Sequence, residues 1–424
     1  MNKKITVAIA GLGSRGYNTY AEICKKLPED IEIVAVAEPR EATMRIFREN
    51  FSVKDEMCFD TAEEMLSHDK LADVMFICTL DRMHYSQAIA ALRKGYDLLL
   101  EKPISVNPKE CKEIADLANA LGRKVIVCHV LRYTMFYQTI KKYIDEGKIG
   151  DVMSIQAIER VCYWHQAHSF VRGNWRNSDT TSSMILQKCC HDMDIYLWLA
   201  GHKCVSVSSF GGLNYFNKDN APEGATEHCS EKCSMYDKCV YNPFRYYGDL
   251  LKKGFYWPLD VVIPEPDEKL LDKALKEGQY GKCVFLTDNN VVDHQAVNLL
   301  LENGATINFT MSAFTAAPGR TMLIMGTKGH IEASMDDNVM DLCVFGEKPE
   351  HIDVGKLCDD FMGHGGGDGR MINSLVKLFR DGVSDPAITT IDRSVESHYV
   401  AMAAEDSRAN GGKLINMDEY IKAI

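Results

Sequence analysis

The sequence lacks the features that mark membrane, secreted and nucleic-acid-binding proteins. No stretch reaches about 18 uninterrupted apolar residues, the length that spans a bilayer. The N-terminal apolar run Ile5–Ala10 leads directly into glycines, with no signal-peptide core and cleavage site behind it. Basic residues are too few to offset the acidic ones, since 48 Lys and Arg face 60 Asp and Glu, for a net charge of −12. We therefore expect neither a membrane nor a nucleic-acid partner.

Cysteine is not scarce, but its placement argues against a disulfide framework. The chain has 15 cysteines, an odd number. Several of them, including Cys24, Cys78, Cys111 and Cys128, fall inside expected strands or helices. In a chain without a secretion signal, this pattern indicates reduced thiols and a cytoplasmic location.

Over the first 130 residues, short apolar runs alternate with helical patterns. Such runs predict strands at Lys4–Ala10, Ile31–Ala37, Asp73–Thr79, Asp97–Leu100 and Val125–His129, with helices around 41–50, 61–67, 84–94 and 108–121. Apolar strands alternating with helices indicate a parallel sheet covered on both faces. Because 424 residues exceed one compact core, we expect a second domain after it.

The first predicted strand ends in a G-x-G-x-x-G motif formed by Gly11, Gly13 and Gly16. Alone the motif is weak, but here a strand precedes it, a helix follows it, and Glu38 stands at the tip of the second strand. That setting predicts a Rossmann domain that binds a dinucleotide at the helix N-terminus. Glu38 would bind the ribose hydroxyls and repel a 2′-phosphate, favouring NAD over NADP, although Arg40 lies close by.

A second motif follows the fourth long strand and carries a resemblance to a known family. The run Leu100-Glu101-Lys102-Pro103, the strand end Thr79–His84 and the turn Glu146–Gly150 resemble the glucose–fructose oxidoreductase / inositol dehydrogenase / rhizopine-catabolism (Gfo/Idh/MocA) family. That strand end reads T-P-N-x-x-H in the family, whereas Leu80 and Asp81 fill its middle positions here.

The resemblance implies an NAD-binding domain at 1–128 and a substrate-binding and oligomerisation domain at 129–424, built on a large, mostly antiparallel open sheet. The active site would lie between the domains, and the open sheet face would form a homodimer or homotetramer. Lys102 would hydrogen-bond the reacting hydroxyl. The residues expected to bind the cofactor are Gly11, Gly13, Ser14, Arg15, Gly16, Glu38, Thr79, His84, Glu101 and Lys102.

His191 is the second catalytic candidate, as general base or as its partner. The family places an Asp four residues before this histidine, on the same helix face, but here the position holds Gln187. An amide orients an imidazole without stabilising its protonated form. Asp194 could supply the missing anion or instead support a domain contact, and Lys188 could share the site.

Substrate-binding candidates come from two segments. The expected loop 163–176 offers Tyr163, Trp164, Trp175 and Arg176, suited to the apolar faces and hydroxyl rim of a sugar, although such a loop could also be ordinary surface or an oligomer contact. The glycine loop Gly363–Asp368 contains His364, which resembles a histidine of the family's NAD-dependent glycosidase branch. It could equally be a turn before the helix expected at Met371–Arg380.

Residues 215–285 form an insert that does not fit the family pattern. It contains Cys229, Cys233 and Cys239, which His228 or the distant Cys283 could complete as a zinc or iron–sulfur site. The spacing matches no regular metal-binding pattern, so we expect reduced thiols and no metal.

Together these features predict an NAD-dependent oxidoreductase that moves a hydride between NAD and a ring hydroxyl of a sugar, sugar derivative or inositol. The alternative is an NAD-dependent glycoside-cleaving enzyme that oxidises the ring transiently and eliminates the aglycone without net redox change. A non-catalytic NAD sensor is a third reading, which the presence of both Lys102 and His191 disfavours.

Overall fold

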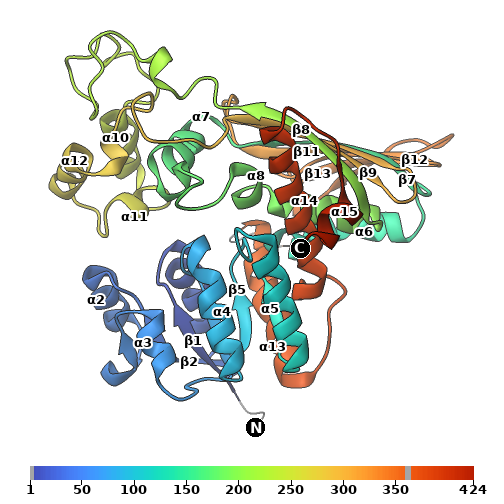
Figure 1. Cartoon of the computed structure of the whole chain (residues 1–424), viewed down its shortest axis with the longest axis horizontal. Coiled ribbons are helices and arrows are strands. Elements are labelled where there is room, and N and C mark those ends of the chain that lie inside the picture. Colours follow the sequence, from blue (N-terminus) through green and yellow to red (C-terminus); the bar gives the residue numbers. More distant parts are fainter. Residues whose placement is uncertain (1–3, 359–363) are drawn as a thin grey trace.

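The computed structural model describes residues 4–358 and 364–424, and its elements gather around two sheets (Figure 1). The first sheet has the order β3-β2-β1-β4-β5-β6, and every pair in it is parallel. Its strands are β1 Ile5–Ala10, β2 Ile31–Ala37, β3 Cys58–Phe59, β4 Val74–Ile77, β5 Asp97–Leu100 and β6 Val125–Val127. The strand order reverses direction between β1 and β4, where ligands bind in doubly wound sheets. The predicted parallel Rossmann sheet is confirmed.

Helices follow these strands at the predicted places. They are α1 Glu22–Lys25, α2 Glu41–Asn50, α3 Ala62–Ser67, α4 His84–Arg93 and α5 Pro108–Ala120. Local chemistry fixes several starts: Thr61 caps α3 by accepting from the Glu64 N–H, and Asn107 caps α5 just before Pro108. The sequence missed β3, which is two residues long and too short to show a periodicity.

The second sheet has nine strands in the order β14-β13-β12-β11-β7-β10-β9-β8-β15. They are β7 Val152–Arg160, β8 Cys204–Gly212, β9 His294–Leu301, β10 Thr306–Ser312, β11 Gly319–Gly326, β12 Gly329–Ser334, β13 Val339–Val344, β14 Glu350–Asp353 and β15 Ile415–Asn416. Only β7 and β10 pair in parallel. The expected large, mostly antiparallel sheet is therefore confirmed.

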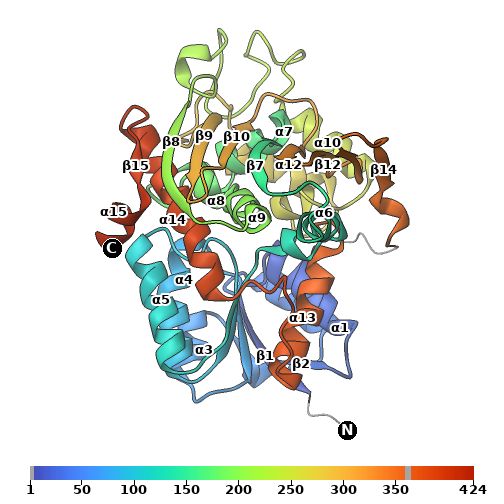
Figure 2. The same ribbon diagram turned by 90° about the vertical axis from the view of Figure 1, so that its right-hand side faces the viewer.

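One face of this sheet is covered by helices and the other is open. The helices beside it are α6 Met135–Asp145, α9 Cys190–Ala200, α14 Ile391–Ala409 and α15 Met417–Lys422 (Figure 2). Along β10, Ile307, Phe309 and Met311 are buried, whereas Thr306 and Asn308 between them are exposed. This period of two is expected of a strand with one covered face.

A late segment of the chain returns to the first sheet. Helix α13 Gly367–Asp381 buries Met371, Ile372 and Leu375 in the cluster that contains Val7 and Ile9 of β1 (Figure 2). Beyond α13, the Val127 N–H donates to the Thr389 carbonyl at 2.8 Å. Residues 367–390 therefore pack against the first sheet, although they come late in the sequence. The division of the chain into domains at 1–128 and 129–424 stays a prediction.

The insert lies between β8 and β9. It holds α10 Pro243–Lys253, α11 Leu259–Val262 and α12 Glu268–Glu277, which share a small core containing Tyr247, Leu259 and Leu271. Its far end touches the first domain, because Asn18 donates to Asp260 at 2.8 Å. No helix in the described part of the chain has the length and apolar character that crossing a bilayer requires.

The packing of α13 can be tested at Leu375, which is fully buried. Replacing Leu375 with Ala removes packed methyl groups and leaves a cavity, so we expect about 2–5 kcal/mol of lost stability. Leu414, which is 66% exposed, provides the matched control. The free energy of unfolding of Leu414→Ala, measured in urea, should stay within about 0.5 kcal/mol of the value for the parent protein. Equal midpoints for the two variants would contradict this packing.

Candidate functional site

The glycine turn after β1 has the geometry of a phosphate cradle. Gly11 has φ +87°, a left-handed conformation that favours glycine, and a Cβ on Gly16 would lie 1.9 Å from the Gly11 carbonyl oxygen. A Cβ on Gly13, by contrast, would have nothing within 4 Å. The two outer glycines are required by the fold, and the middle one leaves open space beside the backbone. These residues therefore fit the pyrophosphate of a dinucleotide.

Glu38 closes this turn from the end of β2. Its carboxylate accepts the Leu12 N–H at 2.8 Å and the Arg40 guanidinium at 2.6 and 2.9 Å. Burial raises the pKa of Glu38, but the hydrogen bonds and charge of Arg40 outweigh it, and the net shift is downward. A buried carboxylate that stays ionised is suited to the ribose hydroxyls and repels an added phosphate.

Arg15 turns inward from the glycine motif. Its Nε donates to Glu101 at 2.7 Å, and its Nη2 donates to Asp368 of α13 at 2.6 Å. His364 adds a contact between its Nδ1 and the same Asp368 carboxylate at 2.9 Å. Burial would raise the pKa of Asp368, yet Arg15 and His364 hold it well below its ordinary value. The side chains of Arg15 and Glu101 are thus bound to each other, and their expected contact with the cofactor stays a prediction.

The ends of β4 and β5 are fastened together by His84. Its Nδ1 lies 2.7 Å from the Pro103 carbonyl oxygen and its Nε2 lies 3.1 Å from that of Thr79. The Thr79 hydroxyl donates to Gln87 at 2.7 Å. The peptide bond between Lys102 and Pro103 is cis. Thr79 and His84 therefore shape the strand ends that present Lys102, and their direct contact with the cofactor stays a prediction.

Lys102 meets the second domain at the helix pair α8 Met184–Gln187 and α9. Its Nζ donates to the Gln187 carbonyl oxygen at 2.8 Å. His191 follows on α9, 8% exposed, with an Nδ1 that has no partner among the described residues. Burial lowers the pKa of His191 well below its ordinary value, and Lys102 lowers it further. His191 is therefore neutral at pH 7 and able to accept a proton.

Asp194, which the sequence analysis considered as the anion for His191, pairs with Arg132 instead. Asp194 accepts two hydrogen bonds from Arg132, both at 2.6 Å, in a bidentate pair. Of the two roles left open for Asp194, support of a packing contact is the one the structure gives it. The departure from the family pattern at Gln187 is thus not compensated by Asp194.

Two further histidines stand beside this site, and the sequence reasoning missed them. The ring of His129 lies 5.6 Å from that of His191 and 5.4 Å from that of His398. His398 accepts the Ile104 N–H at 2.9 Å and thereby braces the segment after Lys102. His129 lies two residues after the end of β6, so its place at the carboxyl edge of the sheet was the available signal; His398 on α14 gave none.

Lys188 belongs to a buried charged cluster on the second sheet. Its Nζ lies 3.3 Å from Glu159, which also pairs with Arg320 at 2.9 Å. Arg320 in turn donates to Asp192 at 2.7 Å. Two carboxylates and two cations thus form one network, which includes Asp192, the residue after His191 in the chain. The side chain of Lys188 is 20% exposed and can therefore reach a ligand.

The expected loop 163–176 is mostly helical, which corrects the sequence prediction. α7 Tyr163–His165 continues into a helical turn at Gln166–Arg172 in which every residue is buried. Trp164 packs on the insert, with its ring 5.6 Å from that of Trp257, and Tyr163 lies 6.0 Å from Tyr241. A segment buried all round has no amphipathic period, which is why the pattern did not indicate a helix.

Trp175 and Arg176 have partners that fix the domains. Trp175 Nε1 donates to Asp81 at 3.1 Å, and Ser182 also donates to that carboxylate. Asp81 is one of the two departures from the family's strand-end motif, so this departure supplies an interdomain contact. Arg176 pairs with Asp288 at 2.6 Å. The expectation that Trp175 and Arg176 bind substrate stays a prediction, as it does for His364; Gly363, which opens that loop, lies outside the described residues.

Comparisons with known proteins agree with this geometry. Residues 5–129 match the model described as "Oxidoreductase family, NAD-binding Rossmann fold", and residues 141–382 match "Oxidoreductase family, C-terminal alpha/beta domain" of Gfo/Idh/MocA proteins. The chain belongs to the Gfo/Idh/MocA oxidoreductase family. Its NAD-binding domain and its character as a dehydrogenase of CH–OH groups follow from that membership.

Individual relatives are distant. YteT of Bacillus subtilis is 23% identical over 388 residues, which cover 87% of this chain and 88% of YteT. An inositol 2-dehydrogenase of Corynebacterium glutamicum is 25% identical over 208 residues, covering 49% of this chain and 57% of that protein. The solved WlbA dehydrogenase of Bordetella pertussis, in complex with NADH and UDP-GlcNAcA, has a TM-score of 0.71 at 15% identity, with 98% of each chain covered. That last likeness concerns the fold alone.

The cradle at Gly13 can be tested by adding the Cβ that the open space admits. We expect Gly13→Ala to fold normally, because nothing lies within 4 Å, yet to weaken NAD binding at least about tenfold, because the methyl group occupies the phosphate approach. Isothermal titration with NAD measures this. Gly248→Ala, at a helical position of the insert that is equally open, is the matched control and should leave the affinity unchanged.

Proposed function

We propose that this family member is an NAD-dependent dehydrogenase whose substrate is a sugar, a sugar derivative or an inositol, oxidised at a ring hydroxyl. The observation that carries the proposal is the meeting of Lys102 and His191. These side chains come from different domains, and Lys102 donates a 2.8 Å hydrogen bond to the carbonyl of Gln187, four residues before His191. A polar pair at a domain junction beside a dinucleotide cradle is suited to alcohol oxidation.

The two residues have different roles in this proposal. His191 is neutral and its side chain is 8% exposed, so its imidazole accepts the hydroxyl proton in this proposal. Lys102 donates a hydrogen bond to the same oxygen and favours the developing negative charge, exchanging its present acceptor, the Gln187 carbonyl, for the substrate. NAD held at Gly11–Gly16 and Glu38 would supply the hydride acceptor.

Recognition of a ring fits the surroundings of this pair. The aromatic side chains Tyr163 and Trp164 lie on α7. Burial lowers the pKa of the neighbouring His165, which is also close enough to Lys188 and Lys102 for their charges to lower its pKa further. Apolar faces beside charged donors suit a ring with hydroxyls on its rim. A related inositol 2-dehydrogenase acts on a polyol of this kind, which supports the substrate class without fixing the substrate.

Cleavage of a glycoside is the second candidate, and His364 is the observation that favours it. This histidine is close enough for its charge to affect His191, and its own Nδ1 is held by Asp368. A second acid–base group at the site is what elimination of an aglycone would need. His364 side-chain exposure is 47%, so it is accessible to a ligand.

Assembly into a homodimer or homotetramer is part of the same proposal, with the open face of the second sheet as the contact. Met153 and Ile158 of β7 and Leu300 of β9 are between 42 and 46% exposed there. Apolar side chains on an open sheet face favour association with a second copy. We also propose a cytoplasmic location, supported by buried thiols such as Cys24, Cys111 and Cys190, none of which is in a disulfide.

The substrate proposal is tested by following NADH absorbance and aglycone release together, across inositols, free sugars and aryl glycosides. We expect NADH to accumulate with at least one inositol or sugar. Aglycone release without NADH would instead establish the glycoside-cleaving alternative. Absence of both products, with NAD bound, would contradict either catalytic proposal.

The pair is tested by Lys102→Met and His191→Asn, each expected to lower kcat/KM by about 100-fold or more. For the parent enzyme, the lowered pKa of His191 means that the proton acceptor stays neutral as the pH falls through 6.5. The acidic limb of log kcat/KM against pH should therefore have its midpoint below 6.5. Lys109→Met, on the surface turn of α5, is the matched control and should behave like the parent. An acidic midpoint at or above 6.5 would contradict the role of His191.

A further inference from the structure

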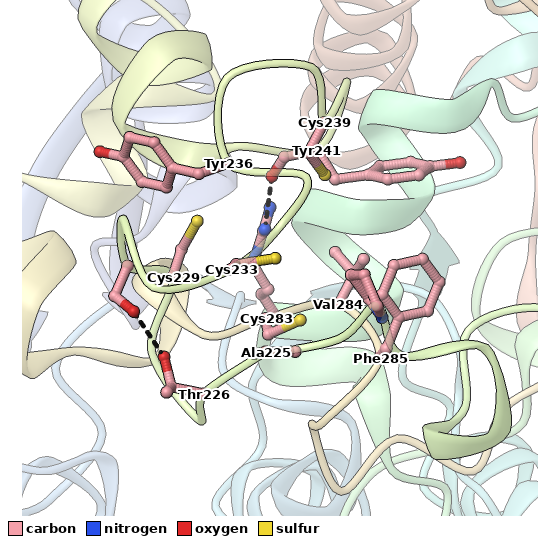
Figure 3. Close-up of a pocket in the computed structure, with 13 residues that line it drawn as sticks. Ala225, Thr226, Cys229, Cys233, Tyr236, Cys239, Tyr241, Cys283, Val284 and Phe285 are labelled. Carbon is pink, nitrogen blue, oxygen red and sulfur yellow. Dashed lines mark hydrogen bonds between the residues drawn. The ribbon is translucent and has the colours of Figure 1, made fainter.

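Four cysteines of the insert line one cavity. Cys229, Cys233 and Cys239 come from the segment before α10, and Cys283 comes from the segment after α12 (Figure 3). Their backbones are fixed to each other: the Cys229 N–H donates to Gly281 at 2.9 Å, and the Cys283 N–H donates to Glu227 at 2.8 Å. The sequence left Cys283 as one possible fourth member of the set, and the fold brings it to the other three.

Arg172 stands on the same cavity wall as a buried cation. It is 3% exposed, and it donates to the Lys282 carbonyl at 2.7 Å and the Tyr241 carbonyl at 2.6 Å. Within residues 4–358 and 364–424, no carboxylate forms an ion pair with it. A buried charge without a counter-charge is costly, so this environment calls for negative charge in the cavity.

Thiolates held by a metal would provide that charge. Four thiolates around one divalent ion leave a net charge of about −2, which the adjacent guanidinium offsets. The rest of the lining is mixed: Val284 and Phe285 are apolar, whereas Thr226 and Ser230 carry hydroxyls that hydrogen-bond each other at 2.9 Å. The cavity has a volume of about 20 Å³, which is enough for a single ion.

We propose that Cys229, Cys233, Cys239 and Cys283 form a structural zinc site that ties the two ends of the insert together. In the described residues, no group of three or more His, Cys, Asp or Glu side chains is close enough to hold a metal ion as it stands. The four cysteines line the same cavity (Figure 3), and zinc binding would require their sulfurs to converge on one point in it. Each thiol loses its proton to solvent as its sulfur binds the ion.

The test is the metal content of the full-length protein, expressed with zinc supplied and with any affinity tag removed. We expect about one zinc per chain by mass spectrometry. Cys233→Ser and Cys283→Ser should each lower the zinc content at least about fivefold, because a three-thiolate site binds more weakly. Cys343→Ser, a half-buried cysteine on β13 far along the chain, is the matched control and should keep the metal.

A second measurement needs no variant. Limited proteolysis with and without a strong chelator should show new cleavage within residues 213–293 once zinc is withdrawn, and protection when zinc is restored. Parent protein that carries less than about 0.1 zinc per chain, or zinc that persists in both cysteine variants, would overturn the site. Iron with labile sulfide in place of zinc would overturn the zinc assignment. None of these readouts depends on turnover, so they stand apart from the proposed dehydrogenase activity.

Discussion

The guanidinium of Arg15 joins three parts of the first domain that are far apart in the sequence. It bonds Glu101 at the end of β5 and Asp368 at the start of α13, while its own backbone belongs to the glycine motif. Because both carboxylates are buried, each needs this cation to remain ionised. The cofactor turn, the strand end that carries Lys102 and the returning helix are therefore held in one arrangement by a single side chain.

The reacting centre depends on a second set of contacts, which cross between the domains. Asp81 accepts from Trp175, Arg82 donates to the Ser178 carbonyl at 2.9 Å, and Lys102 donates to Gln187. All three come from the carboxyl edge of the first sheet, where β4 and β5 end. The same edge that positions a dinucleotide thus also positions the helices that carry His191.

Local features were readable from the sequence. Gly11, Gly16 and Glu38 each meet a backbone or charge requirement of one turn, and so their roles follow from their spacing within a strand–turn–helix pattern. Lys102 was found because it directly follows a strand. The sequence could also indicate a second, antiparallel domain, through a resemblance rather than a periodicity.

Long-range partners were not readable. Arg15 was expected to face the cofactor, but its partner Asp368 is 353 residues away, and no local pattern announces such a pair. The segment Gln166–Arg172 is a helix in which His168 and Arg172 bond distant atoms, as in the contact between His168 and the Tyr247 hydroxyl at 2.7 Å. Polar residues of this kind suggest a surface loop until the fold supplies their partners.

The path of the chain between the domains limits how they can move. It leaves the first domain after β6, returns into α13, and leaves again near Thr389, which bonds Val127 of β6. These crossings lie together beside α13, whereas Asn18 and Asp260 meet on the other side, where α11 stands over the first domain (Figure 1). The chain connections beside α13 would act as a hinge between the domains, and the side-chain contacts at the opposite edge would hold the domains together there. Loss of the contact between Asn18 and Asp260 would therefore free the α11 edge while the chain connections beside α13 still join the domains.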